Sequence, residues 1–249
     1  MSVWVVVPTY DEAENLGPLV RAVVAAVPGV HVLVVDDGSP DGTGAVADRL
    51  AAEHDTVAVL HRPAKRGLGR AYVAGFTHAL TAGATCVVQM DADHSHDPRD
   101  LERLIARVDA ADLVIGSRYI PGGAIEAWGP LRRAVSRAGC AYARRVLAVP
   151  VRDLTGGFKC WRAEALEAIG YAGVRSQGYA FQVELTYRAL ARGLRVEELP
   201  ITFRERASGR SKLTPPIAFE AAWRLPLLRL RADDRESEDG RARTRPRLG

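Results

Sequence analysis

Cysteine is scarce in this chain of 249 residues, and Cys86, Cys140 and Cys160 are far apart and form no CxxC pair. An odd number of widely spaced cysteines predicts neither a disulfide framework nor a zinc site, and a reducing cytoplasm suits such a chain best. Long apolar runs are also missing, since none approaches the roughly 18 residues that a membrane-spanning helix needs. The apolar start, MSVWVVVPTY, is too short for a signal peptide and lacks a basic leader. We therefore expect a protein that is neither secreted nor integral to a membrane.

Several nucleotide-binding and nucleic-acid-binding motifs are absent as well. The sequence has no GxGxxG after its first apolar run and no GxxxxGK[ST], the motifs that bind dinucleotides and the phosphates of NTPs. It contains no zinc finger, no RNP-like pattern and no internal repeat. The net charge of +4 and the pI near 9.1 would suit nucleic acid, anionic lipid headgroups or phosphorylated small molecules. Without a recognition motif, we expect no nucleic-acid partner.

The residues that are present have the composition of a folded protein, with 47% hydrophobic and 26% charged residues. Short β-branched runs alternate with segments of helical period. The expected strands lie at 3–8, 31–37, 56–61, 85–91 and 111–117, and the expected helices at 12–26, 43–53, 68–82 and 98–108. This alternation predicts an α/β fold with a Rossmann-like, mainly parallel central sheet flanked by helices. Such sheets bind ligands beyond the carboxyl ends of their strands.

The pattern changes after residue 119. A basic amphipathic helix is expected near 129–147, a further helix from Tyr179, a strand within 194–203 and a second amphipathic, interfacial segment at 215–230. The last residues, 231–249, are mostly charged, which predicts a disordered tail. We therefore expect one folded domain over 1–230.

Polar loops follow four expected strands, with the sequences PTYDEAEN, DDGSPDGT, RPAKRGLG and DADHSHDP. In the last of these, Asp91 and Asp93 can grip a divalent cation through hard oxygen ligands, and Ser95 could complete the coordination. His94 and His96 are alternative ligands, but no third His or Cys lies at a metal-binding spacing. Mg²⁺ or Mn²⁺ is therefore the expected cofactor.

Simpler structural roles account for part of these loops. Asp97 is expected to cap the helix that begins near Pro98. Asp36 and Asp37 lie in a stretch rich in turn residues and could serve only a turn. Two acidic loops at adjacent strand ends nevertheless favour a site.

Nine blocks of the sequence together resemble one enzyme family. They are VVVPTYDEAENL, VVDDGSPDGT, KRGLGRAY, MDADHSHDP, LVIGSRYIPGG, LRRAVSR, VRDLTGGFKCWR, GYAFQVELTYRA and LPITFRERASGRSKL, in this order. The order is similar to that of polyprenol (dolichol) monophosphate mannose synthases, which are family 2 glycosyltransferases with the GT-A fold. The similarity runs from about residue 3 to residue 213.

The resemblance implies roles for individual residues. Those implied to hold the nucleoside of a sugar nucleotide are Pro8, Tyr10, Glu12, Val34 and Asp36, with Asp91, Ala92 and Asp93 by its diphosphate. The implied ligands of Mg²⁺ or Mn²⁺ are Asp91, Asp93 and Ser95. Arg118, Arg132, Arg206 and Lys212 match basic positions that face the phosphates of donor and acceptor, a task suited to guanidinium groups. Asp91, Asp93 and Arg118 are the expected catalytic residues.

The implied reaction is transfer of mannose from GDP-mannose to a polyprenyl phosphate, with inversion. The expected setting is the cytoplasmic face of a membrane, with peripheral attachment or a separate membrane-protein partner. One alternative keeps the chemistry and changes the sugar, as in transfer from UDP-glucose to undecaprenyl phosphate. Two further alternatives are a nucleotidyltransferase, which would carry a glycine-rich loop after the first strand, and a non-catalytic module that binds a sugar nucleotide or lipid.

Overall fold

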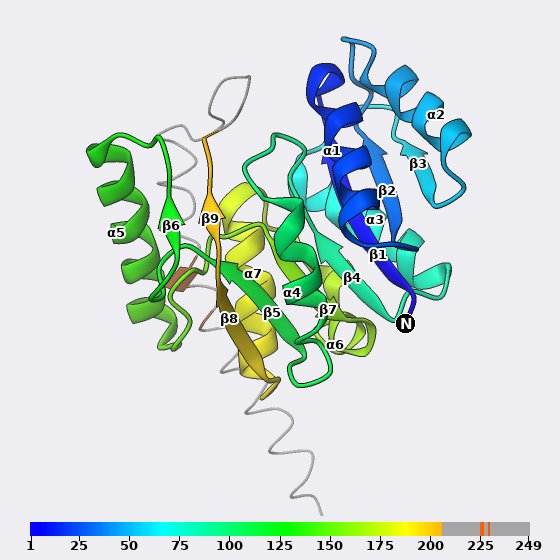
Figure 1. Ribbon diagram of the computed structural model, residues 1–249. Helices are drawn as coiled ribbons and strands as arrows, with labels where there is room; N and C mark the ends of the chain where they lie inside the picture. Colours follow the sequence, from blue (N-terminus) through cyan, green and yellow to red (C-terminus); the bar gives the residue numbers. More distant parts are fainter. Residues whose placement is uncertain (206–224, 227–228, 230–249) are drawn as a thin grey trace, which may run out of the picture.

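The computed structural model describes residues 1–205, 225–226 and 229, and this part of the chain is built around a seven-stranded sheet (Figure 1). The strand order is β3-β2-β1-β4-β7-β5-β8. The strands are β1 Val3–Thr9, β2 His31–Asp36, β3 Val57–His61, β4 Cys86–Gln89, β5 Leu113–Ser117, β7 Lys159–Arg162 and β8 Val196–Pro200. All neighbours pair in parallel except β7, which is antiparallel to both β4 and β5. The predicted mainly parallel sheet is therefore confirmed.

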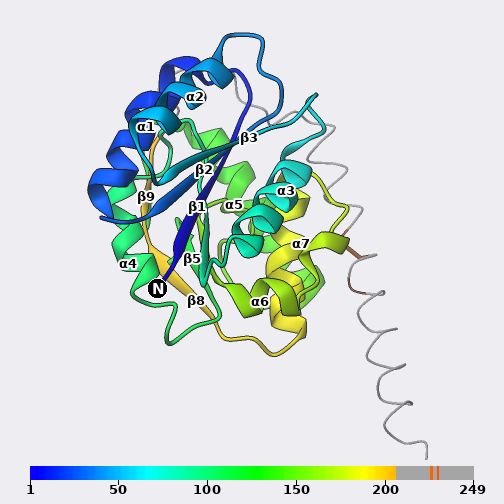
Figure 2. The same cartoon turned by 90° about the vertical axis from the view of Figure 1, so that its right-hand side faces the viewer.

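Helices cover both faces of the sheet. They are α1 Ala13–Ala26, α2 Thr43–Glu53, α3 Leu68–Thr81, α4 Leu101–Ile105, α5 Pro130–Leu147, α6 Ala163–Ala168 and α7 Gly178–Ala191. Figure 2 shows α1, α2 and α4 on one side of the sheet and α3, α6 and α7 on the other. Two apolar cores result, one on each face, and alternate residues of β1 belong to different cores: Val5 to one and Val6 to the other. Gly75 lets α3 approach this strand closely, since a Cβ there would lie 2.4 Å from Cγ1 of Val6.

Some elements differ from the sequence-based expectation. The helix expected over 98–108 is a 3₁₀ turn, Pro98–Asp100, followed by the short α4. The strand expected within 194–203 is interrupted at Ile201, and its second part, β9 Thr202–Phe203, pairs instead with β6 Ala124–Ile125. The sequence did not reveal β6, β7 or α6. The segments expected at 215–230 and 231–249 lie outside the described residues, apart from 225–226 and 229.

Strand β7 decides the position of the loop that precedes it. The first residue of β7, Lys159, lies opposite Gln89 near the end of β4 and opposite Ile115 in β5. Because β7 runs against its neighbours, residues just before Lys159 lie at the rim where β4 and β5 end. Three loops from distant parts of the chain therefore meet there. No helix in the described part of the chain has the length and apolarity to cross a bilayer.

Candidate active site

The loop after β4 carries the paired carboxylates, and surrounding groups hold its shape. The phenol of Tyr72 on α3 donates to Oδ1 of Asp91 over 3.3 Å, and the backbone N–H of Asp91 donates to Nδ1 of His96 over 3.2 Å. The backbone N–H of Ser95 donates to Oδ1 of Asp93 over 3.1 Å. Asp93, Ser95 and His96 are buried, and Asp91 is partly exposed. The loop is therefore ordered by its own hydrogen bonds, with Asp91 nearest to solvent.

The two histidines of this loop support it. The His96 ring stacks on Phe158 at a centroid distance of 4.8 Å. Burial holds the pKa of His96 below its ordinary value, although the charges of Asp91 and Asp93 oppose this effect. The ring is thus neutral at pH 7, and because Nδ1 accepts a hydrogen bond, its proton lies on Nε2. His94, which adopts a left-handed backbone conformation (φ 60°), places Nε2 3.1 Å from the carbonyl oxygen of Asn15.

The donor set of the loop fits a hard divalent cation. Within the described part of the chain, no three His, Cys, Asp or Glu side chains gather into a metal-binding group. A site here would combine the carboxylates of Asp91 and Asp93 with the hydroxyl of Ser95, all oxygen donors. Oγ of Ser95 is buried and lacks a hydrogen-bond partner among the described residues. A buried hydroxyl without a partner costs free energy, so a ligand for it is to be expected.

Asp97 of the same loop has the structural role that the sequence predicted. Its Oδ1 accepts from the backbone N–H of Arg99 over 3.0 Å and caps the turn Pro98–Asp100. Its carboxylate also pairs with the side chains of Arg99 and Arg204. The pKa of Asp97 is held well below its usual range, chiefly by the hydrogen bonds from Arg99. Asp97 is therefore engaged separately from the carboxylates of Asp91 and Asp93.

The acidic loop after β2 lies at the same rim, because β2 and β4 both flank β1. Asp36 is buried and accepts from the hydroxyls of Thr9 and Ser39, over 3.1 and 2.5 Å. Asp37 accepts from the Arg62 guanidinium, and burial raises the pKa of Asp37 despite this contact. Asp36 thus closes a turn and also lies at the rim. Its role in the turn is therefore compatible with a role in a ligand site.

The other residues implied to hold a nucleoside differ in their surroundings. Tyr10 lies just beyond β1, with Nζ of Lys65 3.6 Å from its ring centroid. Glu12 accepts from the side-chain amide of Asn15 over 2.7 Å, and Pro8 is partly exposed within β1. Val34, on β2, is fully buried and packs in one of the two cores, and its role toward the nucleoside stays a prediction. Ala92, between the two aspartates, is buried in the same core.

Arg118, directly after β5, is held by a buried ion pair that the sequence did not reveal. Its Nε donates to Oδ2 of Asp153 and its Nη2 to Oδ1, both over 2.7 Å, and Nη2 also reaches Oγ1 of Thr155 over 2.9 Å. Burial alone would raise the pKa of Asp153, but the Arg118 charge and hydrogen bonds outweigh it and lower that pKa. Both groups are therefore charged, and the guanidinium is fixed with Nη1 left for a ligand.

One cavity brings the carboxylate loop and the basic residues together. Its lining includes Asp91, Arg118, Arg132, Thr155 and Gly157. The Arg132 guanidinium lies 4.0 Å from the ring centroid of Trp128, which also lines the cavity, and pairs with Glu205 over 2.8 Å. Arg206 and Lys212, the other predicted basic ligands, lie outside the described residues. The lining of this small cavity, of about 50 Å³, thus combines one carboxylate with two guanidinium groups, which are side chains of the kinds that bind a metal ion and a phosphate oxygen.

A buried lysine lies beneath this cavity at the start of β7. Nζ of Lys159 donates to the backbone carbonyl of Gln182 over 2.7 Å, and the side chain is fully buried. Burial lowers the pKa of Lys159 to about 7, although the charge of Asp153 opposes the shift.

This depressed pKa predicts a particular dependence of stability on pH. Between pH 7 and 10.5, the unfolded chain holds the proton of Lys159 and the folded chain does not, so stability rises with pH. Below pH 7 the folded chain carries the full free-energy cost of burying the charged Lys159. Relative to Lys159→Met, the wild type should gain a free energy of unfolding on the order of a few kcal/mol between about pH 7 and 10. Urea denaturation at both pH values measures this, with exposed Lys65→Met as control. Parallel profiles for the wild type and Lys159→Met would contradict the expectation.

Comparison with known sequences finds a family model and two close relatives that agree with one another. The family model described as Glycosyl transferase family 2 matches residues 4–170. The polyprenol monophosphomannose synthase of Mycolicibacterium smegmatis is 50% identical over 223 residues, which cover 89% of this chain and 84% of that protein. The undecaprenyl-phosphate mannosyltransferase of Micrococcus luteus is 48% identical over 221 residues, or 89% of this chain and 91% of that protein.

Solved structures share the fold at lower sequence identity. A glucosyl-3-phosphoglycerate synthase from Mycobacterium tuberculosis, in complex with Mn²⁺, UDP and glucosyl-3-phosphoglycerate, superposes with a TM-score of 0.66 and 19% identity. The match covers 93% of this chain and 79% of that one. A mycobacterial protein of known crystal structure gives a TM-score of 0.68 at 22% identity, over 92% and 74% of the two chains. These similarities show that the two proteins share the architecture of this chain.

Proposed function

The chain belongs to glycosyl transferase family 2, and from this premise we propose that it transfers mannose from GDP-mannose to a polyprenyl phosphate. The products would be polyprenyl β-D-mannosyl phosphate and GDP. The names of the two relatives, at 50% and 48% identity, support a mannosyl group and a polyprenyl-phosphate acceptor. Transfer of another sugar, such as glucose from UDP-glucose, is the second candidate, because the same cavity would serve that reaction.

The observation that carries this proposal is the shared cavity of Asp91, Arg118 and Arg132. A donor diphosphate needs positive charge from a metal, and an acceptor phosphate needs positive charge from the protein. The cavity lining includes Asp91 of the carboxylate loop, where a metal would bind, and the guanidinium groups of Arg118 and Arg132. Asp36 and Tyr10 continue the rim toward β2, where the nucleoside would lie.

A divalent cation, when bound by Asp91, Asp93 and Ser95, would supply Lewis-acid stabilisation of the leaving diphosphate. Tyr72 orients Asp91 through the hydrogen bond of 3.3 Å, and the backbone N–H of Ser95 orients Asp93. The Mn²⁺ in the glucosyl-3-phosphoglycerate synthase complex supports a divalent ion in this fold. The choice between Mg²⁺ and Mn²⁺ is part of the proposal.

The proposed reaction requires little acid–base catalysis by the protein. An oxygen of the lipid phosphate forms a bond to the anomeric carbon while the bond from that carbon to the GDP oxygen breaks, and GDP leaves with the electron pair. A phosphate monoester has a second pKa of about 6 and is largely dianionic at pH 7, so no general base is needed. Arg118, held rigidly by Asp153, and Arg132, held over Trp128, would orient this phosphate for inversion at the carbon.

Helix α5 supports the proposed membrane setting. It spans Pro130–Leu147, in agreement with the helix predicted near 129–147. Its inward residues are Cys140, Ala143 and Leu147, whereas Leu131 and Val135 are 77% and 49% exposed. Exposed apolar residues beside arginines suit the headgroup region of a bilayer, where a polyprenyl phosphate would present its phosphate. We propose peripheral association with the cytoplasmic face of a membrane, directly or through a separate membrane-protein partner.

Radiolabelled sugar transfer tests the proposal. The protein is incubated with a polyprenyl phosphate in liposomes and with labelled GDP-mannose or UDP-glucose, in the presence of Mg²⁺, Mn²⁺ or EDTA. We expect label in the lipid extract from GDP-mannose only, and none with EDTA. Label from UDP-glucose alone would replace the donor and keep the acceptor. No lipid-bound label from either donor would refute the proposed reaction.

A further inference from the structure

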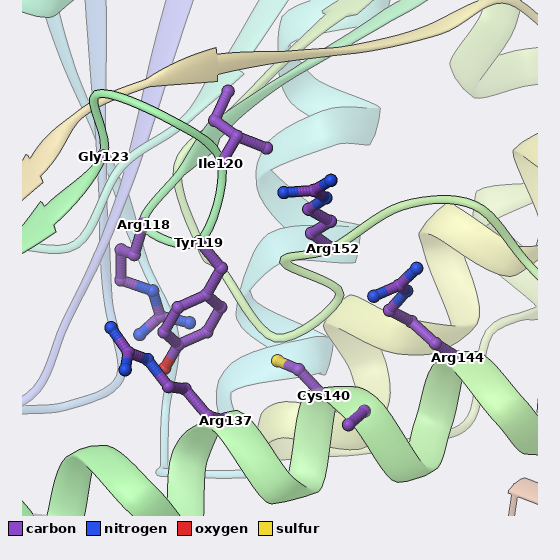
Figure 3. Close-up of a pocket in the computed structure, with 9 residues that line it drawn as sticks. Arg118, Tyr119, Ile120, Gly123, Arg137, Cys140, Arg144 and Arg152 are labelled. Atoms are coloured by element: carbon purple, nitrogen blue, oxygen red, sulfur yellow. The ribbon is translucent and has the colours of Figure 1, made fainter.

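A second cavity, of about 340 Å³, lies between α5 and two loops and is lined by four arginines (Figure 3). Figure 3 shows Arg137, Cys140 and Arg144 rising from one face of α5 toward Tyr119 and Arg152. Arg118 also lines this cavity and so forms a wall common to it and to the cavity that contains Asp91. The carboxylate loop and Arg132 take no part in its lining. It is therefore a neighbouring space with its own set of charges.

The described acids in this part of the fold bind groups other than the guanidinium groups of Arg137, Arg144 and Arg152. Asp153 is fully engaged by Arg118. Glu198 accepts from the hydroxyl of Ser117 over 2.7 Å and from the backbone N–H groups of Arg152 and Asp153, over 2.8 and 2.9 Å. Within the described ranges, Arg137, Arg144 and Arg152 make no ion pair with an acidic side chain. Three like charges around one cavity repel one another unless an anion joins them.

Individual arginines of this cavity also carry groups that could bind an anion. Nε of Arg144 is buried and has no hydrogen-bond partner among the described residues. The backbone N–H of Arg152 donates to the carboxylate of Glu198, and the Arg152 guanidinium projects toward the cavity (Figure 3). The Arg137 guanidinium lies 5.9 Å from the ring centroid of Tyr119, and both Arg137 and Arg152 are exposed to solvent, where a ligand can reach them. Guanidinium groups gathered around one cavity bind phosphate oxygens through charge-assisted hydrogen bonds.

From these observations we propose that the cavity of Arg137, Arg144 and Arg152 is a second anion site, which binds a phosphate group beside the reaction centre. Its volume of about 340 Å³ is enough for a phosphate or diphosphate group. The phosphate could belong to an anionic lipid headgroup or to a free phosphorylated metabolite, because the same forked donors recognise both. Since Arg118 lines both cavities, an anion here would change the potential at the proposed acceptor phosphate. The inference concerns binding and does not depend on the proposed sugar transfer.

The first test measures binding of inorganic pyrophosphate by calorimetry, in EDTA and at fixed ionic strength. The variant is Arg144→Gln with Arg152→Gln, which leaves Arg118 and Arg132 in place. The matched control is Arg21→Gln with Arg49→Gln, which removes the same charge from α1 and α2, at the opposite end of the molecule from α5 (Figure 1). We expect the pocket variant to raise the Kd at least about tenfold, and the control to stay within about threefold.

A second test identifies the source of the phosphate. Sedimentation with phosphatidylglycerol vesicles, compared with phosphatidylcholine vesicles, is measured for the same three proteins. Loss of the phosphatidylglycerol preference in the pocket variant alone would assign the site to lipid headgroups. Loss of pyrophosphate binding with an unchanged lipid preference would assign it to free phosphates. Equal behaviour of pocket and control variants in both assays, or no binding by the wild type, would overturn the site. Neither assay contains a sugar donor, so either result leaves the proposed reaction to its own test.

Discussion

Asp93→Asn should lower the rate of sugar transfer by at least about 100-fold, because it weakens binding of the divalent cation that would stabilise the leaving diphosphate. A 100-fold loss corresponds to about 2.8 kcal/mol of transition-state free energy. The substitution keeps the size of the side chain, and the amide oxygen can still accept from the backbone N–H of Ser95. What it removes is one of two negative charges that would hold the divalent cation. A second readout is the increase in Tm caused by Mn²⁺, which should be lost in the variant together with activity.

Asp97→Asn is the matched control for this loop. It removes the same charge four residues away, and asparagine caps a turn as well as aspartate does. The carboxylate of Asp97 pairs with Arg99 and Arg204 and has no part in the proposed metal site. We expect transfer within about threefold of the wild type, with the Mn²⁺ effect on Tm retained. If both variants lost activity equally, the assignment of Asp93 as a metal ligand would fail.

Asp153→Asn should destabilise the folded protein by about 3–5 kcal/mol, because it leaves the buried charge of Arg118 without a counter-charge. Arg118 and Asp153 have side chains that are 5% and 0% exposed, so water cannot replace the lost partner. Urea denaturation measures the change. The pKa of Asp153 is lowered on folding, so its contribution to stability is present above pH 3.8, its ordinary pKa, and is lost as the pH falls through the lower folded value.

An exposed pair provides the comparison for this effect. Arg107 and Glu197 make an ion pair at 2.6 Å, with side chains 51% and 29% exposed. Glu197→Gln should therefore cost less than about 1 kcal/mol. The double variant Arg118→Met with Asp153→Leu should be more stable than Asp153→Asn, since it buries no unpaired charge. A cost for Asp153→Asn no larger than that for Glu197→Gln would show that the buried pair is dispensable.

Much of the rim could be predicted from the sequence because each polar loop directly follows an apolar run. The rule that parallel strands end at one edge of a sheet was enough to place Asp36, Asp91 and Asp93 at the rim. The capping role of Asp97 followed from its position before Pro98, since that signal is local. The parallel direction of β1, β2, β3 and β4 was equally accessible, because helices of clear period separate these strands, whereas their order in the sheet was not predicted.

The remaining parts of the site depend on contacts between distant residues. Nothing in the sequence around Asp153 marks it as the partner of Arg118, since the pair forms only when the loop before β7 returns to the rim. Tyr72 resembled any core aromatic residue on a helix face, and only its contact with Asp91 distinguishes it. Strand β7 has four residues, too few for a period to show.

The place of β7 between β4 and β5 has a consequence for the order of assembly during synthesis. Strands β1 to β4 precede β5 in the chain, are joined by helices and form one contiguous part of the sheet. Strand β5 has no partner in the sheet until β7 and β8 have been made, and β4 remains an open edge until β7 is made. His96 likewise gains its stacking partner, Phe158, only when the chain before β7 arrives. A nascent chain therefore contains the β1–β4 part of the sheet first, and the loop after β4 acquires its full surroundings only after β7 is inserted.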